Sequence, residues 1–384
     1  MSFTKPSRNI FDAQHDAFRS SVRRFLLKEA QPKVGAWARD GVVDRAFWRL
    51  AAANGLVGFE APEEYGGVGI TDFRYNAILD EEVIYSGIGI DSFSLTNDIV
   101  GPYLVHWTTD DQKARWLPGL TDGSIVAAIA MTEPGTGSDL RGIKSRAIWT
   151  GDCYVLSGAK TFITNGIQAD LVIVAAQVER LGMNGIGLFV VESDMVGFSR
   201  GRKLEKIGRR SQDTAELFFD EVMVPSGNVL GEPDKGLHLM MHNLAQERLS
   251  MAVTAIADAE HTLEFTVAYV LERQAFGQPI GHFQSIRFAI AEMVTEVRVG
   301  RAYVDQCIQA QVAGTLSGDE AAGAKLWLTD LEWRVLDQCL QLHGGYGYME
   351  EYEIARRWRD SRVQRIYGGT NEIMKEIVGR SVGL

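Results

Sequence analysis

The stretch from Ile125 to Pro225 constrains the fold more than any other feature, because it contains several strand-like segments and no long helical stretch between them. The segments are short apolar or alternating runs: IVAAIAM (125–131), SRAIWTGDCYVLSG (145–158), ADLVIVAAQV (169–178), GIGLFVVES (185–193) and AELFFDEVMVP (215–225). Turn residues such as Thr150-Gly151-Asp152 separate them. Strands connected without helices do not form βαβ units, so we expect an antiparallel barrel or sandwich.

Helical patterns occupy the chain on both sides of this stretch. Before it, Asp12 is a candidate N-cap, and apolar residues from Ala13 to Leu26 recur at helical spacing. After it, the segment 283–313 holds an apolar stripe that is typical of core packing in a helix bundle. The predicted fold is therefore α+β, with an N-terminal helical domain (1–124), a middle antiparallel β domain (125–232) and a C-terminal helix bundle (233–384).

Charge and cysteine content exclude several classes of protein. Asp and Glu number 50 and Lys and Arg 39, and the resulting net charge of −11 argues against a nucleic-acid-binding protein. No apolar run approaches the roughly 18–20 residues needed to span a bilayer. Cys153, Cys307 and Cys339 are far apart and lack zinc-ligand spacing. We therefore predict no membrane span, no metal site and a reduced, cytoplasmic location.

Two segments of the predicted middle domain combine irregular backbone with hydrogen-bond donors. MTEPGTGSDL (131–140) follows a strand, and its glycines, Thr132 and Ser138 either form a capped turn or cradle the electron-rich edge of a ligand. The pattern alone leaves these two interpretations equally open. KTFITNG (160–166) places Phe162 at a polar strand end. For that segment alone we expect an ordinary strand with one buried aromatic residue.

Glu247 lies on the apolar face of a predicted long helix. Steps of three and four from Met240 lead to Leu244, Glu247, Met251 and then Thr254 or Ala255. The alternative is a Glu at the edge of the stripe that is held by Arg248 or by a neighbouring helix, and this feature taken alone favours that alternative. If the Glu247 carboxyl enters a cavity, loss of solvation raises its pKa and makes it a competent base near neutral pH.

Three segments of the C-terminal third either contact a ligand or only end helices. QLHGGYGYMEEYEIARRWRD (341–360) breaks a helix at Gly344-Gly345, and RIYGGTNEIMKEI (365–377) places another glycine pair before a predicted helix start. RQAFGQPIGHFQSIR (273–287) carries Arg273 and Gln284 around a turn. These side chains could meet phosphate oxygens, although surface solvation is the commoner role of such arginines.

Taken in order, MTEPGTGSD, KTFITNG, RQAFGQPI, QLHGGYGYMEEYEIARRWRD and IYGGTNEI resemble the acyl-CoA dehydrogenase family, and so does PEEYGGVG (62–69). The resemblance covers essentially the whole chain, and the motifs at 131–142 and 341–360 are long and specific. It implies an N-terminal helical domain, a middle β-barrel and a C-terminal four-helix bundle. This order agrees with the α, β, α pattern described above.

The resemblance also implies that FAD lies between the barrel and the bundle, with part of its site supplied by a neighbouring subunit. Cofactor contacts would fall on Ile129, Met131, Thr132, Gly137, Ser138, Phe162, Ile163, Thr164, Arg273, Phe276, Gln284, Gln341, Leu342, Gly344, Gly345, Thr370 and Glu372. Substrate contacts would fall on Ser138, Arg248, Tyr367 and Gly368.

Two positions depart from the usual family pattern. Phe162 stands where many members have Trp, so the aromatic face is kept and the indole N–H is lost. Gly368 stands where most members have the catalytic Glu. A minority branch, the long-chain and isovaleryl-CoA dehydrogenases, supplies the base at a position that matches Glu247. The helical stripe and the resemblance therefore both indicate Glu247 as the base.

The implied reaction is α,β-dehydrogenation of an acyl-CoA thioester, as in fatty acid β-oxidation. Glu247 would take the α-proton, hydride would pass to flavin N5, and the Gly368 N–H would help to polarise the thioester carbonyl. Electrons would then pass to an electron-transferring flavoprotein. A homotetramer is expected, with a dimer as the alternative. A catalytically silent or monooxygenase-type homologue is the competing prediction, which Gly368 supports, and the acyl chain length stays open.

Overall fold

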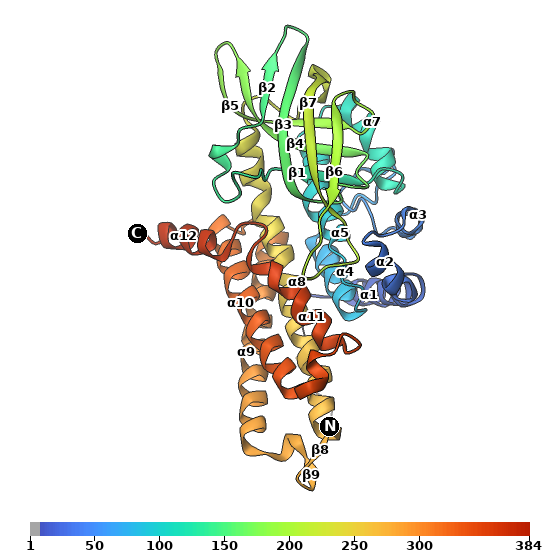
Figure 1. Ribbon diagram of the computed structural model, residues 1–384, viewed down its shortest axis with the longest axis vertical. Coiled ribbons are helices and arrows are strands. Elements are labelled where there is room, and N and C mark those ends of the chain that lie inside the picture. The colour runs from blue at the N-terminus through green and yellow to red at the C-terminus, as the bar shows by residue number, and fades with distance from the viewer. Residues whose placement is uncertain (1–7) are drawn as a thin grey trace.

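Residues 8–384 are described by a computed structural model, in which helices precede and follow a central sheet (Figure 1). Asp12 caps the first helix, because its side chain accepts hydrogen bonds from the N–H groups of Gln14 and His15, as predicted. The N-terminal helices are α1 (Ala13–Phe25), α2 (Val34–Asp40), α3 (Arg45–Ala53), α4 (Phe73–Tyr85), α5 (Ser92–Ser94), α6 (Gly101–His106) and α7 (Asp110–Thr121).

The middle of the chain forms a single sheet of seven strands. The strands are β1 (Ala127–Ala130), β2 (Arg146–Trp149), β3 (Cys153–Thr164), β4 (Leu171–Arg180), β5 (Met183–Glu192), β6 (Phe198–Lys203) and β7 (Thr214–Pro225). Their order is β1-β4-β2-β3-β7-β6, and β5 pairs with β4 along its whole length.

The prediction of a purely antiparallel sheet is wrong for two pairs, since β1 and β2 both run parallel to β4. The reason is that β1 and β2 lie one after the other along β4, opposite residues 171–174 and 177–179, and β3 carries the chain back before β4 begins. The barrel is not confirmed, because no strand pairing within residues 8–384 joins β5 to β6.

Long helices form the C-terminal part. They are α8 (Gly236–Glu272), α9 (Gln284–Val312) and α10 (Gly318–His343), followed by α11 (Glu353–Ser361) and α12 (Asn371–Ser381). Helices α8, α9 and α10 pack on one another, and the shorter helices α11 and α12 both pack against α10. The hairpin of β8 (Gln274–Ala275) and β9 (Gln278–Pro279) joins α8 to α9 at the end of the bundle that is remote from the sheet (Figure 1).

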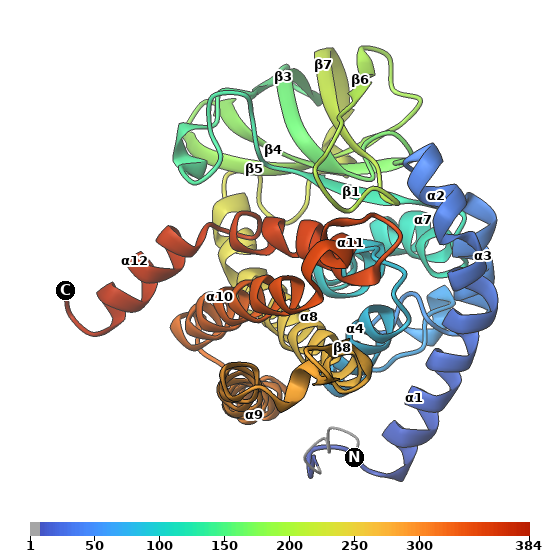
Figure 2. The same ribbon diagram turned by 60° about the horizontal axis from the view of Figure 1, so that its bottom comes forward.

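Helix α8 ties the sheet, the N-terminal helices and the bundle together (Figure 2). Its first turns pack Leu239 and Met240 against Ile173 and Leu188 of the sheet. Farther along, α8 shares a core with α4, α9 and α10. The segment of α8 between these two cores therefore lies where all three parts of the molecule meet. Within residues 8–384, none of the helices combines the length and the apolar character that crossing a membrane requires.

Candidate active site

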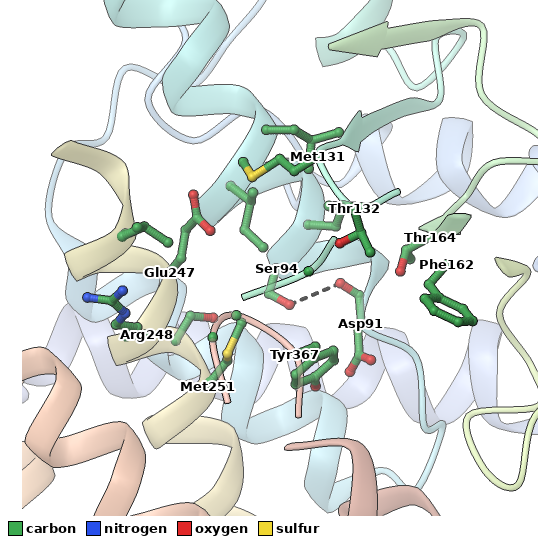
Figure 3. A pocket seen from close by; sticks show the side chains of 18 of the residues that line it. Asp91, Ser94, Met131, Thr132, Phe162, Thr164, Glu247, Arg248, Met251 and Tyr367 are labelled. Carbon is green, nitrogen blue, oxygen red and sulfur yellow. Dashed lines mark hydrogen bonds between the residues drawn. The ribbon is translucent and has the colours of Figure 1, made fainter. Parts of the chain in front are cut away.

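A pocket of about 290 Å³ opens at this junction (Figure 3). It gathers the predicted residues of 129–138, 162–164, 247–248 and 367–368, which are far apart in the sequence. The lining residues are Asp91, Ser94, Leu95, Ile99, Ile129, Met131, Thr132, Gly137, Ser138, Leu140, Phe162, Ile163, Thr164, Leu244, Glu247, Arg248, Ser250, Met251, Thr254, Tyr367, Gly368, Gly369 and Ile373.

Helix α8 contributes one face to the pocket. Leu244, Glu247, Met251 and Thr254 all line it, which is the spacing of three and four that the sequence predicted for one face of a helix. Glu247 is only 5% exposed and faces Met131 across the pocket (Figure 3). The Tyr103 hydroxyl of the neighbouring helix α6 contacts Glu247, as expected for a Glu held by Arg248 or a neighbouring helix, and the same carboxyl also lines the pocket.

The electrostatic environment of Glu247 favours its protonated form. Burial raises the pKa of Glu247 from its ordinary value of 4.5 to about 7, and the nearby Asp98 carboxyl acts in the same direction. The Arg248 guanidinium and a hydrogen bond from the Tyr103 hydroxyl, 3.5 Å from Glu247 Oε1, act in the opposite direction. A carboxyl group in this setting can accept a proton near neutral pH.

Arg248 is the cation beside this carboxyl. It is 7% exposed, and burial lowers the pKa of its guanidinium. Its Nε has no hydrogen-bond partner among residues 8–384. Because an unpaired buried donor is costly, the Arg248 side chain is suited to bind an acceptor group of a ligand.

The loop after β1 is fixed from behind by Glu133. The Glu133 carboxylate accepts hydrogen bonds from the backbone N–H groups of Lys144 (2.7 Å) and Ser145 (2.9 Å) and from Lys160 Nζ (2.8 Å). Lys160 also donates to the carbonyl of Met131 at 3.0 Å. With its rear side anchored in this way, the loop directs the segment 131–138 toward the pocket. Met131, Thr132, Gly137 and Ser138 of this loop line the pocket.

Phe162 differs from the sequence-based expectation. Its side chain is 68% exposed rather than buried, and its ring lies at the edge of the pocket (Figure 3). The cause is an irregularity in β3, where the register against β7 shifts between Lys160 and Ile163 and the backbone φ of Phe162 is +60°. This bulge turns an aromatic face outward, where a planar ligand can stack on it.

Gly368 lies opposite α8 in the turn before α12. Its φ is +62°, and a Cβ at this position would lie 2.2 Å from Met251 Cε. The backbone conformation therefore favours glycine, and any larger residue would have to displace the flexible end of Met251. Two carboxyl-bearing residues line the pocket, Glu247 on α8 and Asp91 before α5, and position 368 contributes none.

The other predicted residues lie elsewhere. Arg273, Leu342, Gly344 and Gly345 line a second, open pocket at the remote end of the bundle, where the Arg273 guanidinium lies 5.5 Å from the centre of the Tyr346 ring. The remaining predicted cofactor contacts line neither of these two pockets: Phe276, Gln284, Gln341, Thr370 and Glu372. Phe276 is 95% exposed at the hairpin between α8 and α9.

Sequence reasoning missed one wall of the first pocket. Asp91, Ser94, Leu95 and Ile99 form it, and Tyr103 supplies the hydrogen bond to Glu247. These residues come from short helical segments after α4 that carry no recognisable motif. The sequence offers one indication of them, the run LTNDIVGPYLV (95–105), in which polar residues interrupt a mostly apolar segment.

The residue types at the site bear on which cofactor it suits. No group of three His, Cys, Asp or Glu residues is arranged to hold a metal ion in the part of the chain from 8 to 384. Cys153, Cys307 and Cys339 are buried thiols. The combination of an outward aromatic ring at 162, an anchored loop at 131–138 and a buried base suits a planar cofactor next to a substrate that loses a proton.

Comparison with known proteins assigns the family. The acyl-CoA dehydrogenase N-terminal, middle and C-terminal domain models match residues 12–124, 128–222 and 234–383. The mitochondrial long-chain specific acyl-CoA dehydrogenase of Mus musculus is 45% identical over 98% of this chain and 88% of that protein. The mitochondrial isovaleryl-CoA dehydrogenase of Oryza sativa subsp. japonica is 35% identical over 99% of this chain and 94% of that protein.

Solved structures agree with this assignment. The crystal structure of acyl-CoA dehydrogenase from Geobacillus kaustophilus has a TM-score of 0.95 and 46% identity, and the match covers 98% of this chain and 100% of that one. An acyl-CoA dehydrogenase from Bacillus anthracis complexed with FAD has a TM-score of 0.91 and 30% identity over 99% of this chain and 68% of that one. The chain therefore belongs to the acyl-CoA dehydrogenase family of flavin-dependent oxidoreductases.

Proposed function

We propose that this protein oxidises an acyl-CoA thioester to the trans-2-enoyl-CoA, with Glu247 as the acceptor of the α-proton. The observation that carries the proposal is the buried Glu247 carboxyl, which lines the pocket and has a pKa raised to about 7. A carboxylate that has lost most of its hydration is a stronger base than one in water. The close similarity to long-chain and isovaleryl-CoA dehydrogenases supports the same reaction class.

The residues around Glu247 have separate proposed tasks. Arg248 and Ser138 contact the acyl-CoA, and Tyr367 packs beside it. The Gly368 N–H donates to the thioester carbonyl and stabilises the negative charge that develops there, a contribution of roughly 3 kcal/mol for one donor. The positive φ of Gly368 orients this N–H.

We propose that the same pocket holds the flavin ring of FAD. The contacts are the 129–138 segment, the aromatic face of Phe162 and its neighbours Ile163 and Thr164. When bound, FAD accepts the hydride that leaves the β-carbon of the substrate. The anchored loop and the outward Phe162 ring support this placement, because both present their contacts before any ligand arrives.

The second set of predicted cofactor contacts indicates a second subunit. Arg273 follows α8 about 39 Å from Glu247, at roughly 1.5 Å per residue of helix. One extended FAD does not span this distance, so we propose that Arg273, Phe276, Gln284, Gln341, Leu342, Gly344 and Gly345 act on the cofactor of a neighbouring subunit. Thr370 and Glu372, at the start of α12 between the pocket residues Gly369 and Ile373, are proposed to complete the FAD site. This arrangement requires at least a dimer, and we propose a homotetramer.

The proposal also covers the domain boundaries, the electron acceptor and the compartment of the protein. We propose domains 1–124, 125–232 and 233–384, and the three family models that match within them support this division. We propose an electron-transferring flavoprotein as the acceptor of electrons. The buried, unpaired thiols are compatible with action in a reducing compartment such as the cytoplasm.

Substitution of Glu247 by Gln tests the proposal. Gln keeps the shape of the side chain and cannot accept the α-proton, so we expect normal flavin content and a turnover number lower by about 10²- to 10⁴-fold. The matched control is Glu272→Gln, which removes the same charge from the exposed end of α8. Turnover is measured with a panel of acyl-CoAs and an artificial acceptor. Unchanged turnover of Glu247→Gln on the best substrate contradicts the proposal.

A further inference from the structure

Two buried carboxyl groups meet behind the pocket. Asp80 on α4 and Asp98 in the short helical segment η4 (Leu95–Val100) both contact the hydroxyl of Ser250 on α8. Ser250 Oγ lies 2.7 Å from Asp80 Oδ2 and 2.6 Å from Asp98 Oδ2. The two carboxyl groups also lie within hydrogen-bonding reach of each other. Neither Asp is a lining residue of the pocket, whereas Ser250 is.

The number of protons available to these contacts is limited. A Ser hydroxyl has one proton to donate and two ionised carboxylates have none, so Ser250 can satisfy only one of its two short contacts as a donor. The second contact requires a proton on a carboxyl group. Asn76 Nδ2 donates to Asp98 Oδ1 at 2.5 Å, which favours Asp98 as the ionised member. The proton then belongs to Asp80, whose Oδ1 receives no such hydrogen bond from any residue between 8 and 384.

The surroundings prevent both groups from ionising. Asp80 is 5% exposed and Asp98 is 1% exposed, and no Lys or Arg forms a salt bridge with either of them within residues 8–384. Acidic groups act on the pair or adjoin it, namely Glu60 and Asp91 from the adjoining loops and Glu247 from α8; of these, Asp91 is paired with Arg209 and Glu247 lies beside Arg248. Two unpaired negative charges at this separation in a buried site are strongly unfavourable.

The pair adjoins the proposed base. Ser250 follows Glu247 by three residues on α8, on the same side of the helix, and both line the pocket. The groups that face Glu247 are Arg248 from its own helix, Tyr103 from α6 and Asp98 from η4. Among these, Asp98 is the one that favours a proton on Glu247 by its negative charge.

We propose that Asp80 and Asp98 share one proton, so that the pair carries a single negative charge, located on Asp98. This charge makes Asp98 a positioning residue that increases the proton affinity of Glu247. The inference rests on the proposed role of Glu247 as the base. A base with greater proton affinity removes the weakly acidic α-proton more readily. In agreement, the pKa of Asp80 is raised well above its ordinary value and that of Asp98 is raised to about 6, both through burial.

The pH dependence of turnover in two matched variants tests this inference. Asp98→Asn removes the negative charge beside Glu247, so we expect the acid limb of the kcat profile to move to lower pH by about half a unit or more. Asp80→Asn replaces a protonated acid by a neutral amide that still donates a hydrogen bond. We therefore expect the acid limb to stay at its wild-type position in Asp80→Asn, whatever happens to the rate at the plateau.

Two results overturn the inference. One is an unshifted acid limb in Asp98→Asn, and the other is an equal shift in both variants, which a purely structural role of the pair would produce. The Glu247→Gln profile separates failure of this inference from failure of the proposed function. If the acid limb disappears in Glu247→Gln, Glu247 is the titrating base and the Asp98→Asn result decides the inference alone.

Infrared spectroscopy of the holoenzyme with isotopically labelled aspartate provides a measurement that does not depend on turnover. We expect the C=O stretching band of a protonated Asp carboxyl at neutral pH, and we expect it to be absent in Asp80→Asn. If Asp80→Asn does not fold, the labelled wild-type protein still decides the matter, because absence of any protonated Asp band at neutral pH overturns the inference. A band that persists in folded Asp80→Asn at full intensity overturns it as well.

Discussion

Burial of Glu247 has a cost in stability that a simple substitution can reveal. Its pKa is raised from 4.5 to about 7 by burial, so the folded state binds the proton more tightly than the unfolded state does. Below pH 4.5 the group is protonated in both states and carries no penalty. As pH rises from 4.5 to about 7, the folded state is destabilised progressively, and above about 7 the penalty is constant.

The magnitude follows from the size of the shift. At about 1.4 kcal/mol per pKa unit, the ionised Glu247 lowers the free energy of unfolding by about 3 kcal/mol above pH 7. Unfolding entropy of about 2 cal/mol/K per residue converts this into a change in Tm of about 4 °C for a chain of this size. Glu247→Gln cannot ionise, so we expect it to melt about 4 °C higher than the wild type at pH 8.

Thermal melting at a series of pH values, with both proteins saturated with FAD, measures this difference. The gain of Glu247→Gln at pH 8 should shrink as pH falls and vanish near pH 4.5, since both side chains are then neutral. Glu272→Gln, at the exposed end of α8, should show no comparable gain at pH 8. Equal melting of Glu247→Gln and wild type at pH 8 refutes the argument that burial destabilises the ionised carboxylate.

Two other substitutions test contacts in and near the site. Gly368→Ala should lower the free energy of unfolding by about 1 kcal/mol, because position 368 has a positive φ. It should also raise KM, because the new Cβ displaces the end of Met251 into the pocket. Adding Met251→Ala to the same chain should restore KM in steady-state kinetics, and a KM that stays high contradicts this reasoning. Glu81→Gln should destabilise the protein by about 3–5 kcal/mol at pH 7, because it breaks the buried ion pairs with Arg19 and Arg301 at 2.8 Å. The nearby arginines lower the pKa of Glu81 to about 2, so the stability difference should disappear as pH falls from 4.5 toward 2; a difference in Tm that is the same at pH 7 and at low pH contradicts this assignment.

The sequence predicts those parts of the fold that depend on interactions between residues close together in the chain. The alternation and spacing of apolar residues place the helices and strands in the order that the structure has. The i, i+3, i+4 stripe places Glu247 on the apolar face of its helix, but taken alone it favours a Glu at the edge of the stripe, and the pocket that Glu247 lines is visible only in the tertiary structure. The direction of strand pairing is not a local property. Whether β1 runs parallel or antiparallel to β4 depends on where the hairpin of β2 and β3 folds. The residues of β1 alone therefore do not predict its direction in the sheet.

Residues that were missed depend on contacts between distant segments. Asp80 and Asp98 are 18 positions apart in the sequence, and only the arrival of Ser250 from α8 joins them. The strand pattern predicts a buried Phe162, because an aromatic residue in a strand usually is buried. The bulge that exposes it arises where the pairing register of β3 with β7 shifts. Such features need the tertiary structure, because period and propensity describe one segment at a time.

The glycine at 368 and the carboxyl at 247 are two consequences of one packing arrangement. Met251 lies one turn beyond Glu247 on α8 and occupies the space in front of Gly368, with its Cε 2.2 Å from the point where a Cβ would be. A Glu at position 368 would have to displace Met251 and adopt a left-handed backbone conformation that disfavours side chains. With Met251 in place, the space in front of Gly368 is filled from α8, the same helix that carries Glu247 in the pocket wall. The absence of an acid at 368 therefore has a packing explanation, and the turnover of Glu247→Gln decides between a proton acceptor on α8 and a catalytically silent homologue.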